Sequence, residues 1–327
     1  MTVSSSSILI VGCGNVGSRH LQAIAKLTNL TSIDIVEPSK DAQIIAKSRL
    51  SEIPFDKTKI EVNWHSSLQR VRNECDLTIV ATASVGRVEL IRNLLELGYS
   101  RFLVEKVVCQ STEDYIRLLD DIKAFNAKGW VNTNRRYFEA YQRIKREVED
   151  SKKIYFSVTA GNEGLGCNAI HHLDLFSWFS GSLQIRLNGD FLYNRIFPNK
   201  RGRNFKEFAG TIIGSNDKES VMTISFLPIN NLPRTVTIVG DDLYIVVDET
   251  NEKAHTISGK DELGDLKFRF EHVSGITTKI ATEILEKDNC MLPTLEESFY
   301  GHSELFRIFN DHITQLTGKK MVLCPIT

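Results

Sequence analysis

The sequence has 327 residues, of which 42% are hydrophobic and 25% are charged, and its formal net charge is −1. This balance is typical of a globular protein with room for two domains of ordinary size. A nearly neutral chain has no field that favours a nucleic acid or an anionic membrane, and no apolar run approaches the length of a membrane span. The first residues lack the basic segment of a signal peptide, so we expect a cytoplasmic protein with neither kind of partner.

The cysteines are scattered along the chain and include no C-x-x-C pair. They are Cys13, Cys75, Cys109, Cys167, Cys290 and Cys324. Zinc ligands and redox pairs are usually spaced more closely than this. We therefore expect free thiols in a reducing compartment and no metal site.

Short apolar runs alternate with amphipathic stretches from residue 7 to residue 134. The pattern predicts strands over 7–12, 31–37, 59–64, 76–83, 101–106 and 130–134, and helices over 15–27, 40–50, 86–98 and 111–125. Alternation of strand and helix indicates a parallel sheet covered on both faces, and such sheets bind ligands at the carboxyl ends of their strands.

The second half of the sequence has a different periodicity. Helices are predicted over 138–150 and 169–181, and two-residue alternation predicts strands over 153–161, 206–214, 220–228, 234–240 and 242–249. A last helix is predicted over 295–316. We expect a first domain over 1–134 and an α+β domain over 135–327 with a large, mostly antiparallel open sheet, and the C-terminal helix is a candidate to return to the first domain.

The segment VGCGNVGSRH, residues 11–20, carries glycines at 12, 14 and 17. It follows an apolar strand and opens a helix, which is the context of a dinucleotide-binding Rossmann fingerprint. Gly12 permits a tight turn, Gly14 lets the backbone approach a pyrophosphate, and Gly17 lets the helix pack closely on the strand. Asn15 and Val16 complete the loop before the helix N-terminus, which attracts negative charge. The alternative, a tight turn without a ligand, requires these features to coincide by chance.

Glu37 ends the second predicted strand, twenty residues after Gly17. A carboxylate at this position accepts hydrogen bonds from both ribose hydroxyls and repels a 2′-phosphate. Lys40 weakens this preference without reversing it. We therefore expect NAD as the cofactor, with NADP less favoured.

Four segments together resemble the Gfo/Idh/MocA oxidoreductases, which include glucose–fructose oxidoreductase, inositol dehydrogenase and several nucleotide-sugar dehydrogenases and ketoreductases. They are VGCGNVGSRH, LVEKVV at 103–108, NRRYFEAY at 134–141 and AIHHLDLFSWFSG at 169–181. The resemblance implies an NAD(P)-dependent oxidoreductase that transfers hydride between nicotinamide and a secondary alcohol or ketone. Its substrate would be a sugar, a cyclitol or a nucleotide-linked sugar. It also implies a homodimer or homotetramer that pairs through residues 205–250.

The resemblance assigns catalysis to Lys106 and His171, which match the lysine of the family's Glu-Lys pair and the histidine of its H-x-x-D segment. It implies that both face the nicotinamide, with the substrate hydroxyl between them. An ammonium group there stabilises or protonates the oxygen on which charge develops. Taken alone, Lys106 also fits a solvated lysine at a strand end. We expect Asp174 to be structural or to orient His171, and His172 to face elsewhere.

The same resemblance implies that Thr82 and Glu105 contact the cofactor. It places Arg135, Cys167 and Asn168 at the substrate. Of the neighbouring Arg135 and Arg136, we expect one to line the active-site cleft and the other to lie on the surface.

Four residues depart from the family pattern. Val107 replaces a proline, Arg87 a histidine, Cys167 an aspartate, and Glu139 stands where the family often has a proline. The altered proline, aspartate and histidine positions give weight to an alternative, a dinucleotide-binding regulator that has lost catalysis. A third class, an enzyme that uses NAD only as a scaffold or an internal redox cofactor, fits less well. The basic run 199–206 fits a solvated turn better than a diphosphate site.

Overall fold

The computed structural model describes the chain except residues 1–4, 57, 72–73 and 259–265. The described chain divides into two compact units. Unit 1 comprises residues 1–109, 114–132 and 271–295, and unit 2 comprises residues 110–113, 133–270 and 296–327. Of the segments late in the chain, unit 1 contains residues 271–295.

Unit 1 is built on a parallel sheet of six strands in the order β3-β2-β1-β4-β5-β6. The strands are β1 (Ser6–Val11), β2 (Leu30–Val36), β3 (Glu61–His65), β4 (Leu77–Val80), β5 (Arg101–Val104) and β6 (Lys128–Val131). The central strands are apolar and largely buried, as expected where helices cover both faces. The predicted doubly wound Rossmann sheet is confirmed.

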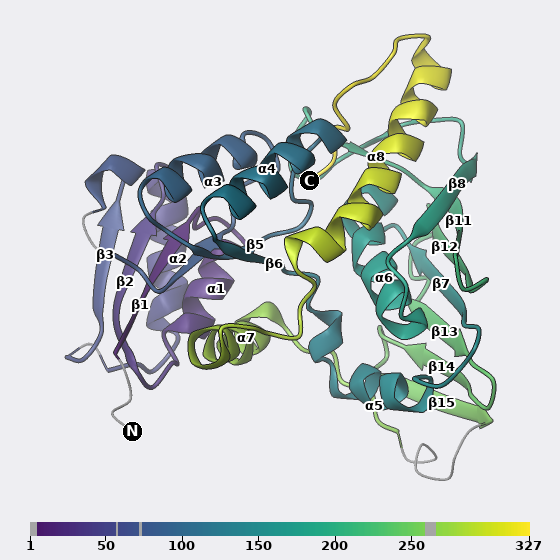
Figure 1. Cartoon of the computed structure of the whole chain (residues 1–327), viewed down its shortest axis with the longest axis horizontal. Helices are drawn as coiled ribbons and strands as arrows, with labels where there is room; N and C mark the ends of the chain where they lie inside the picture. Colours follow the sequence, from purple (N-terminus) through teal and green to yellow (C-terminus); the bar gives the residue numbers. More distant parts are fainter. Residues whose placement is uncertain (1–4, 57, 72–73, 259–265) are drawn as a thin grey trace. The chain divides into compact units, whose positions relative to one another are not determined.

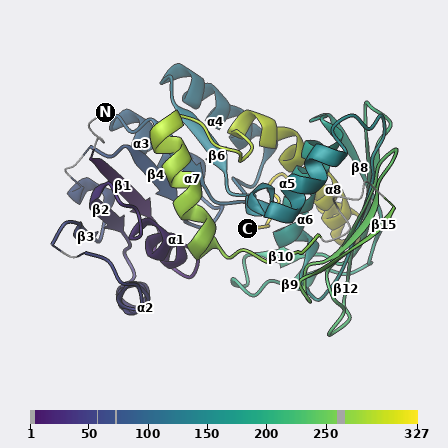
Figure 2. The same cartoon turned by 90° about the horizontal axis from the view of Figure 1, so that it is seen from below.

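Helices cover both faces of this sheet, α3 and α4 on one side and α1, α2 and α7 on the other (Figures 1 and 2). They are α1 (Gly17–Ile24), α2 (Lys40–Ser51), α3 (Arg87–Glu96), α4 (Thr112–Ala124) and α7 (Val273–Lys287), with a 3₁₀ turn η1 (Leu68–Arg70). Helix α7, which packs against α1, was not predicted from the sequence.

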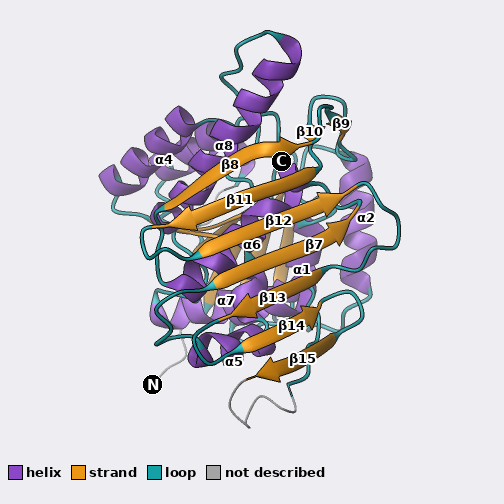
Figure 3. Ribbon diagram, turned by 90° about the vertical axis from the view of Figure 1, so that its right-hand side faces the viewer, coloured by secondary structure: helices purple, strands orange, loops and turns teal. Residues whose placement is uncertain are grey.

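Unit 2 is built on a sheet of seven strands in the order β15-β14-β13-β7-β12-β11-β8 (Figure 3). The strands are β7 (Tyr155–Gly161), β8 (Ile185–Leu192), β11 (Gly210–Asn216), β12 (Val221–Leu227), β13 (Thr235–Val239), β14 (Tyr244–Asp248) and β15 (Lys253–Ser258). Only the β7–β12 pairing is parallel. The predicted, mostly antiparallel sheet is confirmed.

Three helices pack on one face of this sheet, and no helix of the described part of unit 2 covers the other (Figures 2 and 3). They are α5 (Glu139–Glu147), α6 (Leu165–Ser180) and α8 (Leu295–Thr317), with a 3₁₀ turn η2 (Asn134–Tyr137) and a short hairpin of β9 (Phe197–Pro198) and β10 (Lys206–Glu207). Burial alternates along β7 and β12, so the helix-covered face forms the core. Among the described residues, no helix is long and apolar enough to span a bilayer.

Candidate functional site

Five strands of unit 1 end level with one another at the carboxyl edge of the sheet. Cross-strand pairing aligns their last residues, Val36 of β2, Val11 of β1, Val80 of β4, Val104 of β5 and Val131 of β6. The residues that follow are Glu37, Gly12, Ala81, Glu105 and Asn132. The register therefore brings most of the predicted cofactor residues to one edge.

The three glycines of the loop after β1 have different surroundings. Gly12 has φ +85°, and a Cβ on it would lie 2.9 Å from the backbone nitrogen of Thr82. A Cβ on Gly17 would lie 2.0 Å from the carbonyl oxygen of Gly12, so only glycine lets α1 approach the loop this closely. A Cβ on Gly14 would meet nothing within 4 Å. Packing therefore explains Gly12 and Gly17, whereas Gly14 borders open space.

The start of α1 is held by a residue that the sequence did not point to. Arg49 of α2 donates to the carbonyl oxygen of Asn15 at 3.1 Å and to Ser18 Oγ at 2.6 Å. Val16 precedes the helix, and its carbonyl accepts from the amides of Arg19 and His20. The first turn of α1 contains no acidic residue, so its positive end is not offset by a carboxylate of its own.

Glu37 is bound to the loop by backbone hydrogen bonds. Its Oε2 accepts from the amide of Cys13 at 2.8 Å, and its Oε1 accepts from the amide of Ser39 at 2.9 Å. A carboxylate has about four acceptor positions, so two remain for further donors. Burial, with a smaller contribution from Glu37, raises the pKa of the Cys13 thiol to about 12, which leaves it uncharged.

Glu105 lies in a buried network directly before Lys106. Its Oε1 contacts His20 Nε2 at 2.9 Å and accepts from Asn132 Nδ2 at 2.5 Å, while His20 Nδ1 contacts Thr277 Oγ1 at 2.9 Å. Burial raises the pKa of Glu105, but His20, Asn132 and Lys106 together outweigh it and lower the pKa below its usual value. The position of Glu105 is thus set by a residue of α1 and by the residue after β6, which the sequence did not reveal.

Lys106 and Thr82 follow β5 and β4 at the same edge. Lys106 is only 7% exposed. It is therefore not the solvated lysine that its position at the end of a strand would suggest. Thr82 Oγ1 is buried and has no hydrogen-bond partner within the described structure. An unsatisfied buried hydroxyl group is what a bound molecule would use.

In unit 2, helix α6 carries His171 and Asp174 on its buried side. Asp174 forms a two-pronged ion pair with Arg136, with Nη2–Oδ1 at 2.6 Å and Nε–Oδ2 at 3.1 Å. Burial raises the pKa of Asp174 and Arg136 opposes this only in part, so the pKa stays above its usual value. Asp174 therefore has the structural role that we expected of it.

Arg135 is also in the core, so the expectation that one of the two arginines lies on the surface is wrong. Its Nε and Nη2 contact the two carboxylate oxygens of Glu249 at 3.1 and 3.3 Å. Arg234 and Tyr141 bind the same carboxylate. Burial raises the pKa of Glu249, but Arg135, Arg234 and His172 outweigh it and lower the pKa to about 2. Because this ion pair engages its guanidinium, we leave Arg135 out of the proposed substrate site.

A pocket of about 490 Å³ lies in unit 2 beside the first turn of α6. Its wall includes Cys167 and, from neighbouring segments, Phe197, Phe208, Phe226, Asn162, Asn199 and Asn230. Asn168 is not among the lining residues, and its side chain donates to the carbonyls of Glu163 and Gly164. The pocket thus includes one of the three predicted substrate residues.

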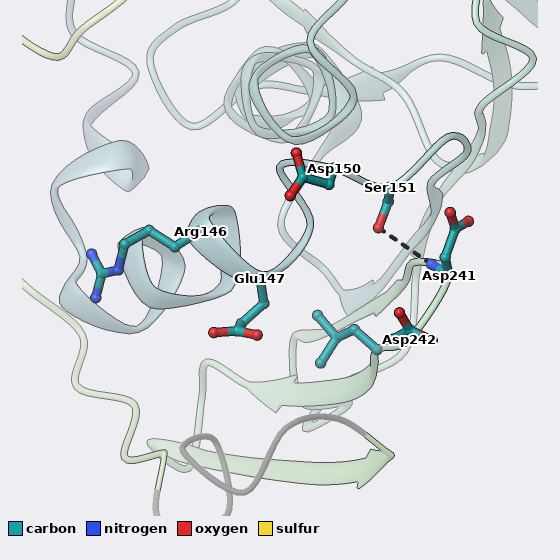
Figure 4. Close-up of a pocket in the computed structure, with 7 residues that line it drawn as sticks. Arg146, Glu147, Asp150, Ser151, Asp241 and Asp242 are labelled. Atoms are coloured by element: carbon teal, nitrogen blue, oxygen red, sulfur yellow. Dashed lines mark hydrogen bonds between the residues drawn. The ribbon is translucent and has the colours of Figure 1, made fainter.

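A second pocket of unit 2, of about 140 Å³, is lined by none of the predicted residues. Figure 4 shows its acidic lining between α5 and the β13–β14 turn, where the Asp241 amide donates to Ser151 Oγ at 3.3 Å. In the described part of the chain, no group of three or more His, Cys, Asp and Glu side chains is arranged to hold a metal ion.

The doubly wound sheet and its glycine loop define unit 1 as a nucleotide-binding domain of the Rossmann class. Residues 6–133 match the family model described as "Oxidoreductase family, NAD-binding Rossmann fold". The match agrees with the resemblance of this segment to the Gfo/Idh/MocA oxidoreductases. No curated protein matches the sequence.

Solved structures share the fold along the whole chain. GenD2 from gentamicin A biosynthesis, in complex with NAD, has a TM-score of 0.70 and 12% identity over 98% of this chain and 97% of its own. The WlbA dehydrogenase from Bordetella pertussis, in complex with NADH and UDP-GlcNAcA, has a TM-score of 0.70 and 15% identity over 100% of both chains. The scyllo-inositol dehydrogenase from Lactobacillus casei, with NAD(H) and scyllo-inositol, has a TM-score of 0.64 and 16% identity over 91% of this chain and 94% of its own.

Proposed function

We propose that the protein is an NAD-dependent oxidoreductase that moves a hydride between nicotinamide and a secondary alcohol or ketone of a carbohydrate-like molecule. The observation that carries the proposal is the level carboxyl edge of unit 1, where the glycine loop, Glu37 and Lys106 follow strands that end in register. The matched family description and the ligands of the similar structures support NAD as the cofactor.

The residues of unit 1 divide the work of holding the dinucleotide. Gly14 and the open N-terminus of α1 suit the pyrophosphate, and the two remaining acceptor positions of Glu37 suit the ribose hydroxyls. The buried hydroxyl group of Thr82 suits a polar group of the cofactor. Glu105 holds the loop of Lys106 in place through His20 and Asn132. The family resemblance assigns it a contact with the cofactor as well.

Lys106 is the proposed proton carrier. NAD bound at this edge would supply the hydride chemistry, which requires a proton to move to or from the substrate oxygen. The ammonium form of Lys106 Nζ gives its proton to the oxygen in reduction, and the amine form takes it back in oxidation. We propose His171 as the second proton carrier. It lies on α6 and is 9% exposed.

The pocket of unit 2 supports a sugar or cyclitol as the substrate class. Three phenylalanines and three asparagines line it, a mixture of apolar and hydrogen-bonding residues that suits a ring with hydroxyl groups. Lys200 and Arg201 line the same pocket, so a nucleotide-linked sugar belongs in the same test. Cys167 stands in this wall where the family has a carboxylate.

We also propose a homodimer or homotetramer that pairs through the face of the unit 2 sheet that no described helix of the unit covers. The strands of residues 205–250 alternate between buried and half-buried side chains, and their half-buried side includes Ile213, Val221 and Val246. Light scattering should report a mass of two or four chains. A monomer at micromolar concentration would contradict this.

A catalytically silent regulator remains the second candidate, because Cys167 lacks the charge of the aspartate it replaces. The deciding experiment screens sugars, cyclitols and nucleotide sugars for the absorbance change of nicotinamide, with wild type and Lys106→Ala. We expect Lys106→Ala to lower kcat by about 10²- to 10⁴-fold with little change in NADH affinity. Lys123→Ala, an exposed lysine of α4, is the matched control.

Each outcome of this screen separates the two candidates. Turnover by wild type that Lys106→Ala loses supports the enzyme. Normal turnover by Lys106→Ala overturns the role of Lys106. Tight NADH binding without turnover of any compound supports the regulator.

A further inference from the structure

Arg87 is the first residue of α3, and its side chain is buried, with the residue only 2% exposed. The preceding Gly86 has φ +68°, a conformation that favours glycine. A cation at a helix N-terminus is unfavourable for the helix, because the helix dipole is positive there. The stability of α3 therefore does not explain an arginine at this place.

The Arg87 guanidinium donates to backbone carbonyls of two separate loops. Its Nη2 donates to Thr82 in the loop after β4. Its Nη1 donates to Glu105, to Val107 at 2.6 Å and to Val108 at 3.3 Å in the loop after β5. The carbonyls of Glu105 and Val107 belong to the residues directly before and after Lys106.

Guanidinium chemistry suits this arrangement. Arginine has five N–H donors in a rigid fork, so a single side chain reaches carbonyls in different directions. Hydrogen bonds from a charged donor are roughly twice as strong as neutral ones, and they offset the cost of burying the charge. A histidine, which the family resemblance places here, has at most two ring donors and cannot make the same set of contacts.

We propose that Arg87 is a positioning residue, which holds the backbone on both sides of Lys106 and ties that loop to the loop of Thr82. The significance of Lys106 in this inference rests on the proposed function. The family proline at position 107 would fix φ by its ring, a constraint that Val107 lacks. The two departures from the family pattern, Arg87 and Val107, are therefore linked. The hydrogen bonds from Arg87 to the backbone carbonyls supply the restraint that the proline ring would give.

Amide hydrogen exchange tests the positioning role without a substrate. Arg87→Lys keeps the charge but loses the fork, and Arg92→Lys, an exposed residue of the same helix that pairs with Glu96, is the control. We expect about 10-fold faster exchange or more in peptides covering 81–86 and 103–109 of Arg87→Lys, with β1 and β2 unchanged. Exchange as slow as in wild type, or faster exchange throughout unit 1, would overturn the proposal.

Kinetics with a substrate from the screen provide the second readout. Arg87→Lys should lower kcat by about 10-fold or more while KM and NADH affinity stay within about 3-fold, because the donor is misplaced and not removed. A loss of NADH affinity with unchanged kcat would contradict this. If wild type turns over no substrate, the proposed function fails, and the exchange experiment still decides the role of Arg87.

Val107→Pro tests the link between the two departures. It removes an amide but keeps the carbonyl that Arg87 contacts. In the Arg87→Lys background it should slow exchange in 103–109 again, and in wild type it should leave the loop folded. A double variant that exchanges as fast as Arg87→Lys alone would show that the ring and the guanidinium do not replace each other.

Discussion

The two units bury charged groups in different ways. In unit 1, two of the charged groups at the sheet edge bond to the backbone: Glu37 accepts from amides, and Arg87 donates to carbonyls. In unit 2, they pair with one another, as in Arg135 with Glu249 and Arg136 with Asp174. Charged side chains bound to the backbone hold loops in place, and Glu37 keeps acceptor positions for a ligand. Side chains in an ion pair use their donors and acceptors on each other.

This contrast bears on where the chemistry lies. Breaking a charge contact in unit 1 should loosen a binding loop and change function before it changes folding. Breaking a pair in unit 2 leaves a buried charge without compensation, so it should change folding first. The following predictions test each side of the contrast.

The largest effect is expected from the glycine loop of unit 1. Gly14→Val should lower NADH affinity by about 1,000-fold or more while the protein stays folded, because the added side chain enters open space needed by the pyrophosphate. Gly17→Ala is the contrasting variant, since its Cβ would lie 2.0 Å from the Gly12 carbonyl oxygen and must disturb the fold. Calorimetric titration and thermal melting measure both. A Gly14→Val protein that binds NADH normally would refute the loop assignment.

The next effect concerns the paired charges of unit 2. Glu249→Gln should lower the free energy of unfolding by about 3–5 kcal/mol at neutral pH, because two arginines lose their buried partner. The pKa of Glu249, about 2, is below its usual 4.5, so its stabilisation is complete above about pH 4.5 and is lost as the pH falls toward 2. The difference between variant and wild type should shrink over that range.

Glu219→Gln is the control for this variant, because Glu219 pairs with Lys153 at the surface. Denaturant unfolding should show nearly the same stability as wild type. Equal losses in the two variants would mean that burial does not decide the effect.

A smaller effect is expected at His172. Burial lowers the pKa of His172 well below 6.5, and neither ring nitrogen has a hydrogen-bond partner among the described residues. The unfolded chain takes up a proton below pH 6.5 that the folded chain does not, so stability falls with falling pH. His172→Phe should remove about 1–2 kcal/mol of the stability difference between pH 7 and pH 5. An unchanged pH dependence in denaturant unfolding would contradict this.

The sequence predicted unit 1 better than unit 2 because the fingerprint of unit 1 is local. Gly12, Gly14 and Gly17 lie within six residues, and the strand periodicity fixes which edge they occupy. The residues that hold the site in place come from distant parts of the sequence. They are Arg49 of α2 and Thr277 of α7. No short-range pattern connects them to the loop.

In unit 2 the sequence predicted helix α6, but it did not reveal which side chain forms an ion pair with Arg135. Arg135 lies within a family motif, which suggested a substrate contact, but its partner Glu249 lies more than a hundred residues later. The charge of an arginine is visible in a sequence, whereas the carboxylate that neutralises it depends on how the sheet folds. For the same reason, the sequence shows only that Arg87 replaces the histidine of the family pattern. Its contacts with backbone carbonyls are seen only in the structure.

The central claim is that unit 1 holds NAD, with Glu37 setting the preference. Calorimetric titration of the wild-type protein with NADH and with NADPH under the same conditions tests it most directly. We expect NADH to bind about 10-fold more tightly or more, because the Glu37 carboxylate accepts from ribose hydroxyls and repels a 2′-phosphate. Tighter binding of NADPH, or no binding of either dinucleotide, would contradict the account.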